Sequence, residues 1–106
     1  MATVSQLGAQ RKLQRYMDIL RRELPKLRAR FHVQYLGLFG SYVQGTPRRG
    51  SDLDVLVEFA EEPSLFKFIE LEDHLSSLLG VKVDLVMKGT LKPLIGRQIL
   101  SEVVGL

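Results

Sequence analysis

Residues 38–58 read LFGSYVQGTPRRGSDLDVLVE, an apolar segment that ends in a Gly-Ser turn and a second apolar segment that begins with two carboxylates. Side chains alternate between the two faces of a strand, so Asp52 and Asp54 should project from the same side of the backbone. Hard divalent cations take oxygen ligands, and Mg²⁺ is usually shared between one or two carboxylates and substrate phosphates. The stretch therefore predicts a nucleotide site.

The sequence on either side of this stretch predicts an α+β fold. Apolar residues recur at helical spacing over about residues 8–30, which indicates an amphipathic first helix. Pro25 lies late in this pattern, and because proline lacks an N–H, we expect it to kink the helix or to begin a second short one. We expect strands at 31–39, 52–59 and 81–87, and further helices at 42–44, from Ser64 to Gly80, and after Thr90.

The last helix is expected to be capped by Thr90 and to tolerate Pro93 in its first turn. Its apolar side chains are expected to point inward. They are Leu94, Ile95, Ile99 and Val103.

The third predicted strand carries one carboxylate, Asp84, in the middle of an apolar segment. A lone carboxylate at such a position is costly unless it is paired or bound to a metal. If this strand lies beside the second one, Asp84 can join Asp52 and Asp54 around a cation. The alternative is that Asp84 is simply a partly exposed strand residue.

Composition limits the possible chemistry. The chain has 106 residues, 45% of them hydrophobic, which suits one compact domain, and it has no cysteine and two histidines. Any metal must therefore be held by carboxylates. No apolar stretch is long enough to cross a bilayer and the first residues do not resemble a signal peptide, so we expect a soluble cytoplasmic protein without membrane contact.

The net charge of +3 conceals an uneven distribution, because residues 1–50 are strongly basic and residues 51–106 are acidic. A basic half suits an anionic ligand or partner. The basic residues of the first thirty follow a helix pattern without interleaved aromatics, which is typical of a solvated helix face. We therefore expect no direct binding of nucleic acid.

Nucleotidyl transfer needs in-line positioning and neutralisation of the charge on phosphorus, and two metal ions supply both. Asp52 and Asp54 are predicted to bind the ion that carries a triphosphate, and Asp84 to help hold a second ion. Gly40 and Ser41 would present backbone N–H groups to the phosphates, since glycine permits close approach. Ser41 could instead merely cap the following turn.

Other interpretations of these residues are weaker. A G-x-x-x-x-G-K-[ST] phosphate loop begins at Gly40 but lacks the lysine, and a calcium loop starting at Asp52 lacks a third oxygen ligand. Asp52 and Asp54 could serve solubility at a strand edge. Arg48 and Arg49 either contact phosphate or form a solvated loop pair.

With Gly40-Ser41, Gly45, Ser51-Asp52-Leu53-Asp54 and Asp84 in these positions, the chain resembles the minimal nucleotidyltransferases (MNT) of the DNA polymerase β superfamily, the antitoxins of HEPN/MNT toxin–antitoxin pairs. The resemblance covers nearly all of residues 1–106 as a single domain. It implies a small mixed β-sheet flanked by helices, like the polymerase β palm. One departure is that Val43 and Gln44 replace the Ala-Arg pair common in the family turn, and glutamine supplies no charge.

The resemblance also implies a function. ATP with two Mg²⁺ ions would donate AMP to a tyrosine hydroxyl of a cognate HEPN ribonuclease toxin, which would silence that toxin within a hetero-oligomer. An alternative is an antitoxin that neutralises its partner by binding alone. Transfer to a small molecule such as an aminoglycoside would normally require a further domain to hold the acceptor.

Overall fold

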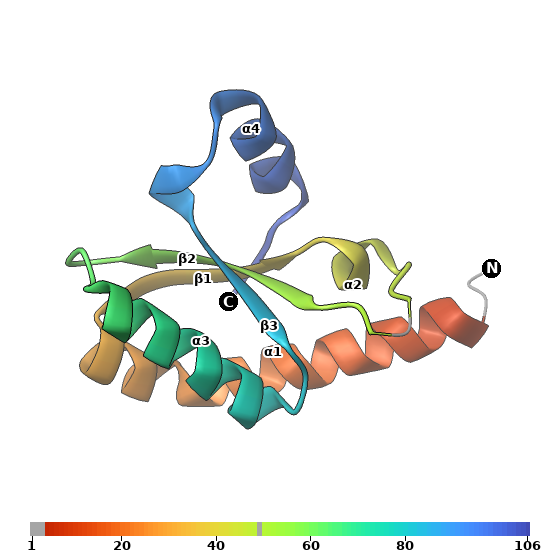
Figure 1. The fold of residues 1–106 in the computed structure, drawn as a ribbon. Helices are drawn as coiled ribbons and strands as arrows, with labels where there is room; N and C mark the ends of the chain where they lie inside the picture. Colours follow the sequence, from red (N-terminus) through yellow and green to blue (C-terminus); the bar gives the residue numbers. More distant parts are fainter. Residues whose placement is uncertain (1–3, 49) are drawn as a thin grey trace.

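The computed structural model describes residues 4–48 and 50–106, which form a mixed four-stranded sheet with helices on both faces (Figure 1). The strand order is β3-β2-β1-β4, and β2 and β3 are parallel whereas β1 is antiparallel to β2 and β4. α1 and α3 cover one face of the sheet, and α4 stands on the other. The elements are α1 Val4–Phe31, β1 Val33–Phe39, α2 Ser41–Gln44, β2 Leu53–Phe59, α3 Leu65–Leu79, β3 Val83–Met87, the 3₁₀ turn η1 Lys88–Thr90, α4 Pro93–Glu102 and β4 Val104–Gly105.

The main core lies between the sheet and the layer formed by α1 and α3. Alternation along β2 turns Leu53, Val55 and Val57 into this core, where all three are fully buried. Buried leucines of α1 and α3 pack in the same cluster, with Leu71, Leu75 and Leu79 recurring every fourth residue. The opposite face of β2 is thereby left free for Asp54.

Backbone N–H groups on the outer edge of β3 donate hydrogen bonds to side chains of α3 rather than to another strand. The Ser76 hydroxyl accepts a hydrogen bond from the Val83 N–H at 3.0 Å, and the Glu72 carboxylate accepts one from the Leu85 N–H at 2.9 Å. Unpaired N–H groups on an edge strand invite pairing with other chains. These two bonds therefore cover the edge and hold α3 and β3 in one alignment.

The α+β fold is confirmed, with corrections at several boundaries. α1 continues unbroken through Pro25 to Phe31, so the suggestion of a second short helix is wrong. Phe31 ends α1 and is buried in the core, and His32 follows with a φ of 57°, so β1 starts at Val33 rather than at residue 31. β3 likewise starts at Val83 rather than at residue 81.

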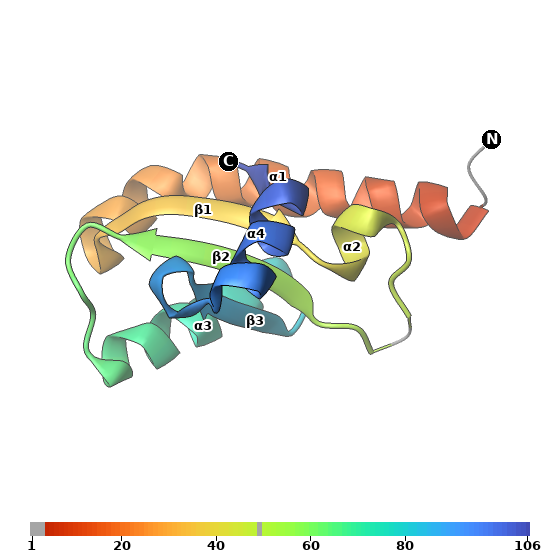
Figure 2. The ribbon, with the colours of Figure 1, turned by 90° about the horizontal axis from the view of Figure 1, so that it is seen from above.

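The expectations for the last helix were wrong in two respects. Thr90 belongs to η1, where its hydroxyl donates to the Met87 carbonyl, and α4 begins after Lys92 without a side-chain cap. Leu94 and Ile95 point outward, with 81% and 52% of their surface exposed. Figure 2 shows α4 lying across the sheet with its outer side uncovered, because in the described part of the chain no further element packs over it.

None of the helices in residues 4–48 and 50–106 combines the length and apolarity that a bilayer span requires.

We predict that Leu75→Ala lowers the free energy of unfolding by about 2–5 kcal/mol, because the fully buried side chain would leave a cavity between α3 and the sheet. The matched control is Leu94→Ala in α4, which should change stability by about 0.5 kcal/mol or less because Leu94 is largely exposed. Urea denaturation followed by circular dichroism measures both. Equal losses in the two variants would contradict this description of the core.

Candidate active site

Three carboxylates gather where β2 and β3 begin. The parallel register places Asp54 directly beside Asp84, and Asp52 immediately precedes β2. The expectation that the second and third strands are neighbours is therefore confirmed. Asp52 and Asp54 are half-buried, whereas Asp84, on the edge strand, is exposed.

Gly40 fits closely against Asp54 at the end of β1. Phe39, the last residue of β1, pairs with Asp54 across the sheet, and Gly40 follows with φ 81° and ψ −154°, a conformation that other residues rarely adopt. A Cβ atom on Gly40 would overlap the Asp54 Oδ2 atom. The Gly-Ser turn and the Asp54 carboxylate are thus in van der Waals contact, and only glycine permits it.

Ser41 opens the four-residue helix α2, which is anchored to α1 by Tyr42. The Tyr42 side chain is buried and meets the Tyr16 ring edge-on, with ring centroids 5.8 Å apart at 76°. Burial, the neighbouring Tyr16 and the Asp52 charge raise the pKa of the Tyr42 hydroxyl above its usual value. No role for Tyr42 was predicted from the sequence, although an aromatic residue directly after Gly-Ser was the available signal.

The loop between α2 and β2 closes on itself near the carboxylates. The Ser51 hydroxyl accepts a hydrogen bond from the Arg48 N–H at 2.7 Å, and the Ser51 N–H donates to the Arg48 carbonyl at 2.9 Å. The Arg48 side chain is exposed, as is Gln44 at the end of α2. Arg49 lies outside the described residues.

The electrostatics of the cluster favour a cation. Burial, followed by the charges of Asp84 and Asp52, raises the pKa of Asp54 to about 6. In the described part of the chain, however, no three Asp, Glu, His or Cys side chains converge closely enough to enclose a metal ion. Carboxylates that repel one another but leave coordination positions open suit an ion shared with substrate phosphates.

Two sizeable cavities lie away from these carboxylates. Cavities of about 570 and 420 Å³ are found at the far ends of β2 and β3, where both are lined by Pro63, Met87 and Thr90. None of the three carboxylates lines either cavity. Because Leu53, Val55 and Val57 face the core, Asp54 lies on the opposite face of the sheet, the face on which α4 stands (Figures 1 and 2).

A mixed sheet with a Gly-Ser turn placed against paired carboxylates is the arrangement of a nucleotide-handling enzyme, and comparison with known proteins agrees. The family model described as Nucleotidyltransferase domain matches residues 17–106, so the chain belongs to the nucleotidyltransferase domain family. The protein adenylyltransferase MntA of Thermococcus cleftensis is 52% identical over 92 residues, which cover 87% of this chain and 93% of that protein.

Solved structures share the fold. A chain assigned as a minimal nucleotidyltransferase is 35% identical, with a TM-score of 0.72 and coverage of 92% of this chain and 95% of that chain. A chain of a toxin–antitoxin complex with AMP-PNP is 30% identical, with a TM-score of 0.63 and coverage of 91% and 70%. A chain from the complex of a tri-AMPylated Shewanella oneidensis HEPN toxin with its MNT antitoxin is 25% identical, with a TM-score of 0.55 and coverage of 94% and 70%.

We predict that Gly40→Ala lowers the free energy of unfolding by at least about 3 kcal/mol, because strain at positive φ adds to the overlap with Asp54. Gly50→Ala is the matched control, since Gly50 has the same φ of 81° but open space around its Cβ position. That variant should lose only about 1 kcal/mol from backbone strain. Urea denaturation measures both, and equal losses would show that the contact with Asp54 is unimportant for stability.

We predict that Asp54→Asn stabilises the protein in metal-free buffer above pH 6. Because the folded state raises the pKa of Asp54 from 3.8 to about 6, the folded protein holds this proton more tightly than the unfolded chain does. Wild-type stability should therefore fall as pH rises from about 4 to about 6 and stay lower above that range. Asparagine is neutral throughout and avoids this loss.

We expect Asp54→Asn to raise the free energy of unfolding by about 1 kcal/mol at pH 7.5. This is well below the free energy that the full pKa shift would correspond to, because solvent screens this half-exposed group. The gain should largely disappear at pH 4. Urea denaturation in EDTA at both pH values measures it, with Glu61→Gln, an exposed carboxylate after β2, as the control. A pH-independent difference between wild type and Asp54→Asn would contradict the prediction.

Proposed function

We propose that this chain transfers AMP from ATP to a tyrosine hydroxyl of a cognate HEPN-type toxin and thereby silences it. The observation that carries the proposal is the register that places Asp54 beside Asp84 with Gly40 packed against the same carboxylate. The family and the adenylyltransferase relative support the reaction class. The AMP-PNP complex and the tri-AMPylated HEPN toxin among the structural relatives support the donor and the partner.

Asp52, Asp54 and Asp84 are the residues proposed to hold Mg²⁺. Their chemistry fits, since they are hard oxygen donors, and burial and the charges of Asp84 and Asp52 raise the pKa of Asp54, a cost that a bound cation would remove. Two Mg²⁺ ions, when bound, neutralise charge on the phosphates and on the acceptor oxygen. The carboxylates must be ionised to hold these ions.

The chain's own groups orient the donor nucleotide. Gly40 and Ser41 are proposed to direct backbone N–H groups of the turn at the triphosphate, and Tyr42 holds that turn on α1 by packing against Tyr16. During transfer the tyrosine oxygen bonds to the α-phosphorus and the bond to pyrophosphate breaks. Asp84, the most exposed of the three carboxylates, is proposed to accept the proton that the tyrosine loses.

The open surroundings of the carboxylates favour a protein acceptor. A small-molecule acceptor needs an enclosing pocket, whereas the described cavities lie at the other end of the sheet. A folded partner could instead bring its tyrosine to the exposed face and cover the site itself. A hetero-oligomer of the two proteins would then complete the active site.

A second candidate function is neutralisation of the toxin by binding alone. It is favoured by one observation, that Gln44 places an exposed, uncharged side chain at the end of the phosphate turn. The two functions differ in whether protection requires the carboxylates.

We predict that co-expression with the HEPN-type product of a neighbouring gene adds AMP-sized mass increments to that protein. Asp52→Ala/Asp54→Ala should reduce the rate of modification by more than about 100-fold, because the groups that hold the metal-bound triphosphate are lost. Intact-mass spectrometry of the co-purified partner measures both. The matched control is Glu61→Ala/Glu62→Ala, which removes two exposed carboxylates in the loop after β2. This variant should modify the partner as fast as wild type does.

An unmodified partner that still co-purifies with wild type, and is still neutralised, would refute the transferase proposal. It would favour neutralisation by binding.

A further inference from the structure

The backbone of Lys82 is held next to the carboxylate cluster. The pairing of Leu53 with Val83 places Lys82 beside Asp52, one residue before the strands on each side. The Lys82 carbonyl accepts a hydrogen bond from the Leu53 N–H at 2.8 Å, and the next residue, Val83, is buried in the core. The backbone that carries this lysine is therefore held rigidly against β2.

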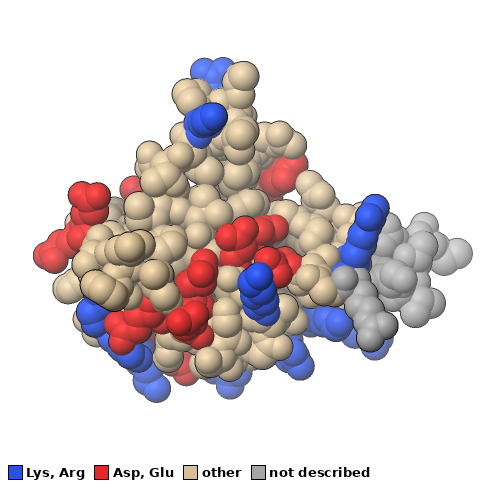
Figure 3. All heavy atoms as spheres, in the orientation of Figure 1, with Lys and Arg blue, Asp and Glu red and all other residues tan. Residues whose placement is uncertain are grey.

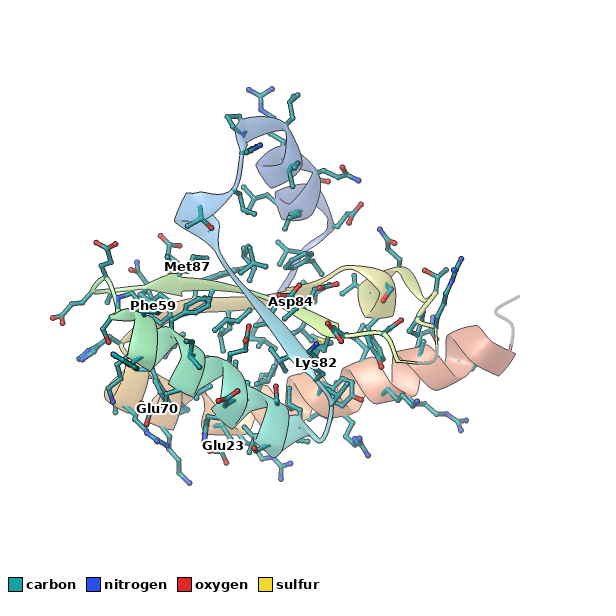
Figure 4. The ribbon with its side chains drawn as sticks, in the orientation of Figure 1. Glu23, Phe59, Glu70, Lys82, Asp84 and Met87 are labelled. Atoms are coloured by element: carbon teal, nitrogen blue, oxygen red, sulfur yellow. The ribbon has the colours of Figure 1, made fainter. Side chains whose placement is uncertain are left out.

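The Lys82 side chain, in contrast, is free to move. Its Nζ atom lies 3.9 Å from the Asp52 Oδ2 atom, and 80% of the side chain is exposed. Figure 4 shows Lys82 and Asp84 at the same end of β3. An exposed ion pair at this distance contributes little to stability, so the ammonium group can leave Asp52 at small cost.

The carboxylate cluster carries a local excess of negative charge, against which Lys82 is the neighbouring cation. Figure 3 shows acidic atoms gathered on this face, whereas the basic atoms lie mostly along the underside, where α1 runs. Among the ion pairs found in the described residues, only that of Lys82 reaches Asp52, Asp54 or Asp84. A triphosphate would bring several more negative charges to the same place.

We propose that Lys82 binds the β- and γ-phosphates of the nucleoside triphosphate donor. A lysine suits this role, because it is a compact charge on a flexible stem and can move from Asp52 to a phosphate oxygen. Asp52 is then released to bind the metal ion that the same phosphates share. The inference rests on the proposed function for the presence of a nucleotide, but it concerns binding and not transfer.

Lys88 provides a matched control at the opposite end of the same strand. It follows β3 as Lys82 precedes it, and its Nζ atom lies 3.7 Å from the Glu58 Oε2 atom. The side chains of Lys88 and Glu58 are both partly exposed, at 44% and 42%. Both lysines thus make surface ion pairs with carboxylates of the neighbouring chain segment, Lys82 with Asp52 just before β2 and Lys88 with Glu58 within it, but only Lys82 is near the proposed nucleotide site.

The test is isothermal titration calorimetry of the purified protein with ATP and with AMP, in Mg²⁺ and again in EDTA. Lys82→Ala should weaken ATP binding by about tenfold or more under both conditions, because a charge-assisted bond to phosphate is lost. AMP lacks the β- and γ-phosphates, so its affinity should not change. Lys82→Arg should largely restore ATP binding, and Lys88→Ala should bind like wild type.

Three results would overturn the proposal. Unchanged ATP affinity of Lys82→Ala would show that the lysine does not contact the nucleotide. A loss for ATP seen only in Mg²⁺ would show that Lys82 acts through Asp52, and an equal loss for ATP and AMP would show a general structural effect. Because no acceptor protein is present, these results do not depend on whether AMP is transferred to a partner.

Discussion

The parallel pairing of β2 with β3 is the constraint on which the rest of the molecule depends. It places Asp54 beside Asp84, two like charges that would separate if the strands were free to do so. α3 connects the two strands and opposes this separation, both through its leucines in the core and through the bonds from Ser76 and Glu72 to the edge of β3. Packing of apolar side chains on one face of the sheet thus holds two neighbouring carboxylates, Asp54 and Asp84, together on the other face despite their repulsion.

β2 contributes both to the buried core and to the carboxylate cluster. Leu53, Val55 and Val57 are fully buried against α1 and α3, and the residues between them face the side where α4 stands. Side chains alternate between the two faces of a strand, so each residue that β2 points into the core places the next residue on the face where α4 stands. A shift of one residue in the register of β2 would turn Asp54 toward the core and Leu53, Val55 and Val57 away from it, so packing specifies the site as strictly as it specifies the core.

The neighbouring strands that carry Asp54 and Asp84 could be predicted from the sequence because the signals for them are local. The alternation of apolar and acidic residues in β2 predicted which side chains share a face, and the Gly-Ser turn marked the end of the preceding strand. The position of Asp84 near Asp52 and Asp54 followed from the single assumption that β3 lies beside β2. The errors concern contacts that the local pattern does not encode. Leu94 and Ile95 follow a helical period, but a period identifies an apolar face without showing whether any element covers it. Lys82 was overlooked because an exposed lysine gains significance only when register places it beside Asp52.

The open position of the cluster has a consequence for how the protein must work. In the proposed reaction, water would compete at an exposed site both as a ligand of phosphate and as an acceptor for the transferred group, so the carboxylates would have to be covered during transfer. The carboxylates line neither of the two cavities at the far ends of β2 and β3, and α4, on the same sheet face, has an exposed apolar surface. A protein acceptor would exclude water and present its hydroxyl in a single step. In such an arrangement only the bound partner completes the site, and restricting transfer to that partner requires no pocket of the enzyme's own.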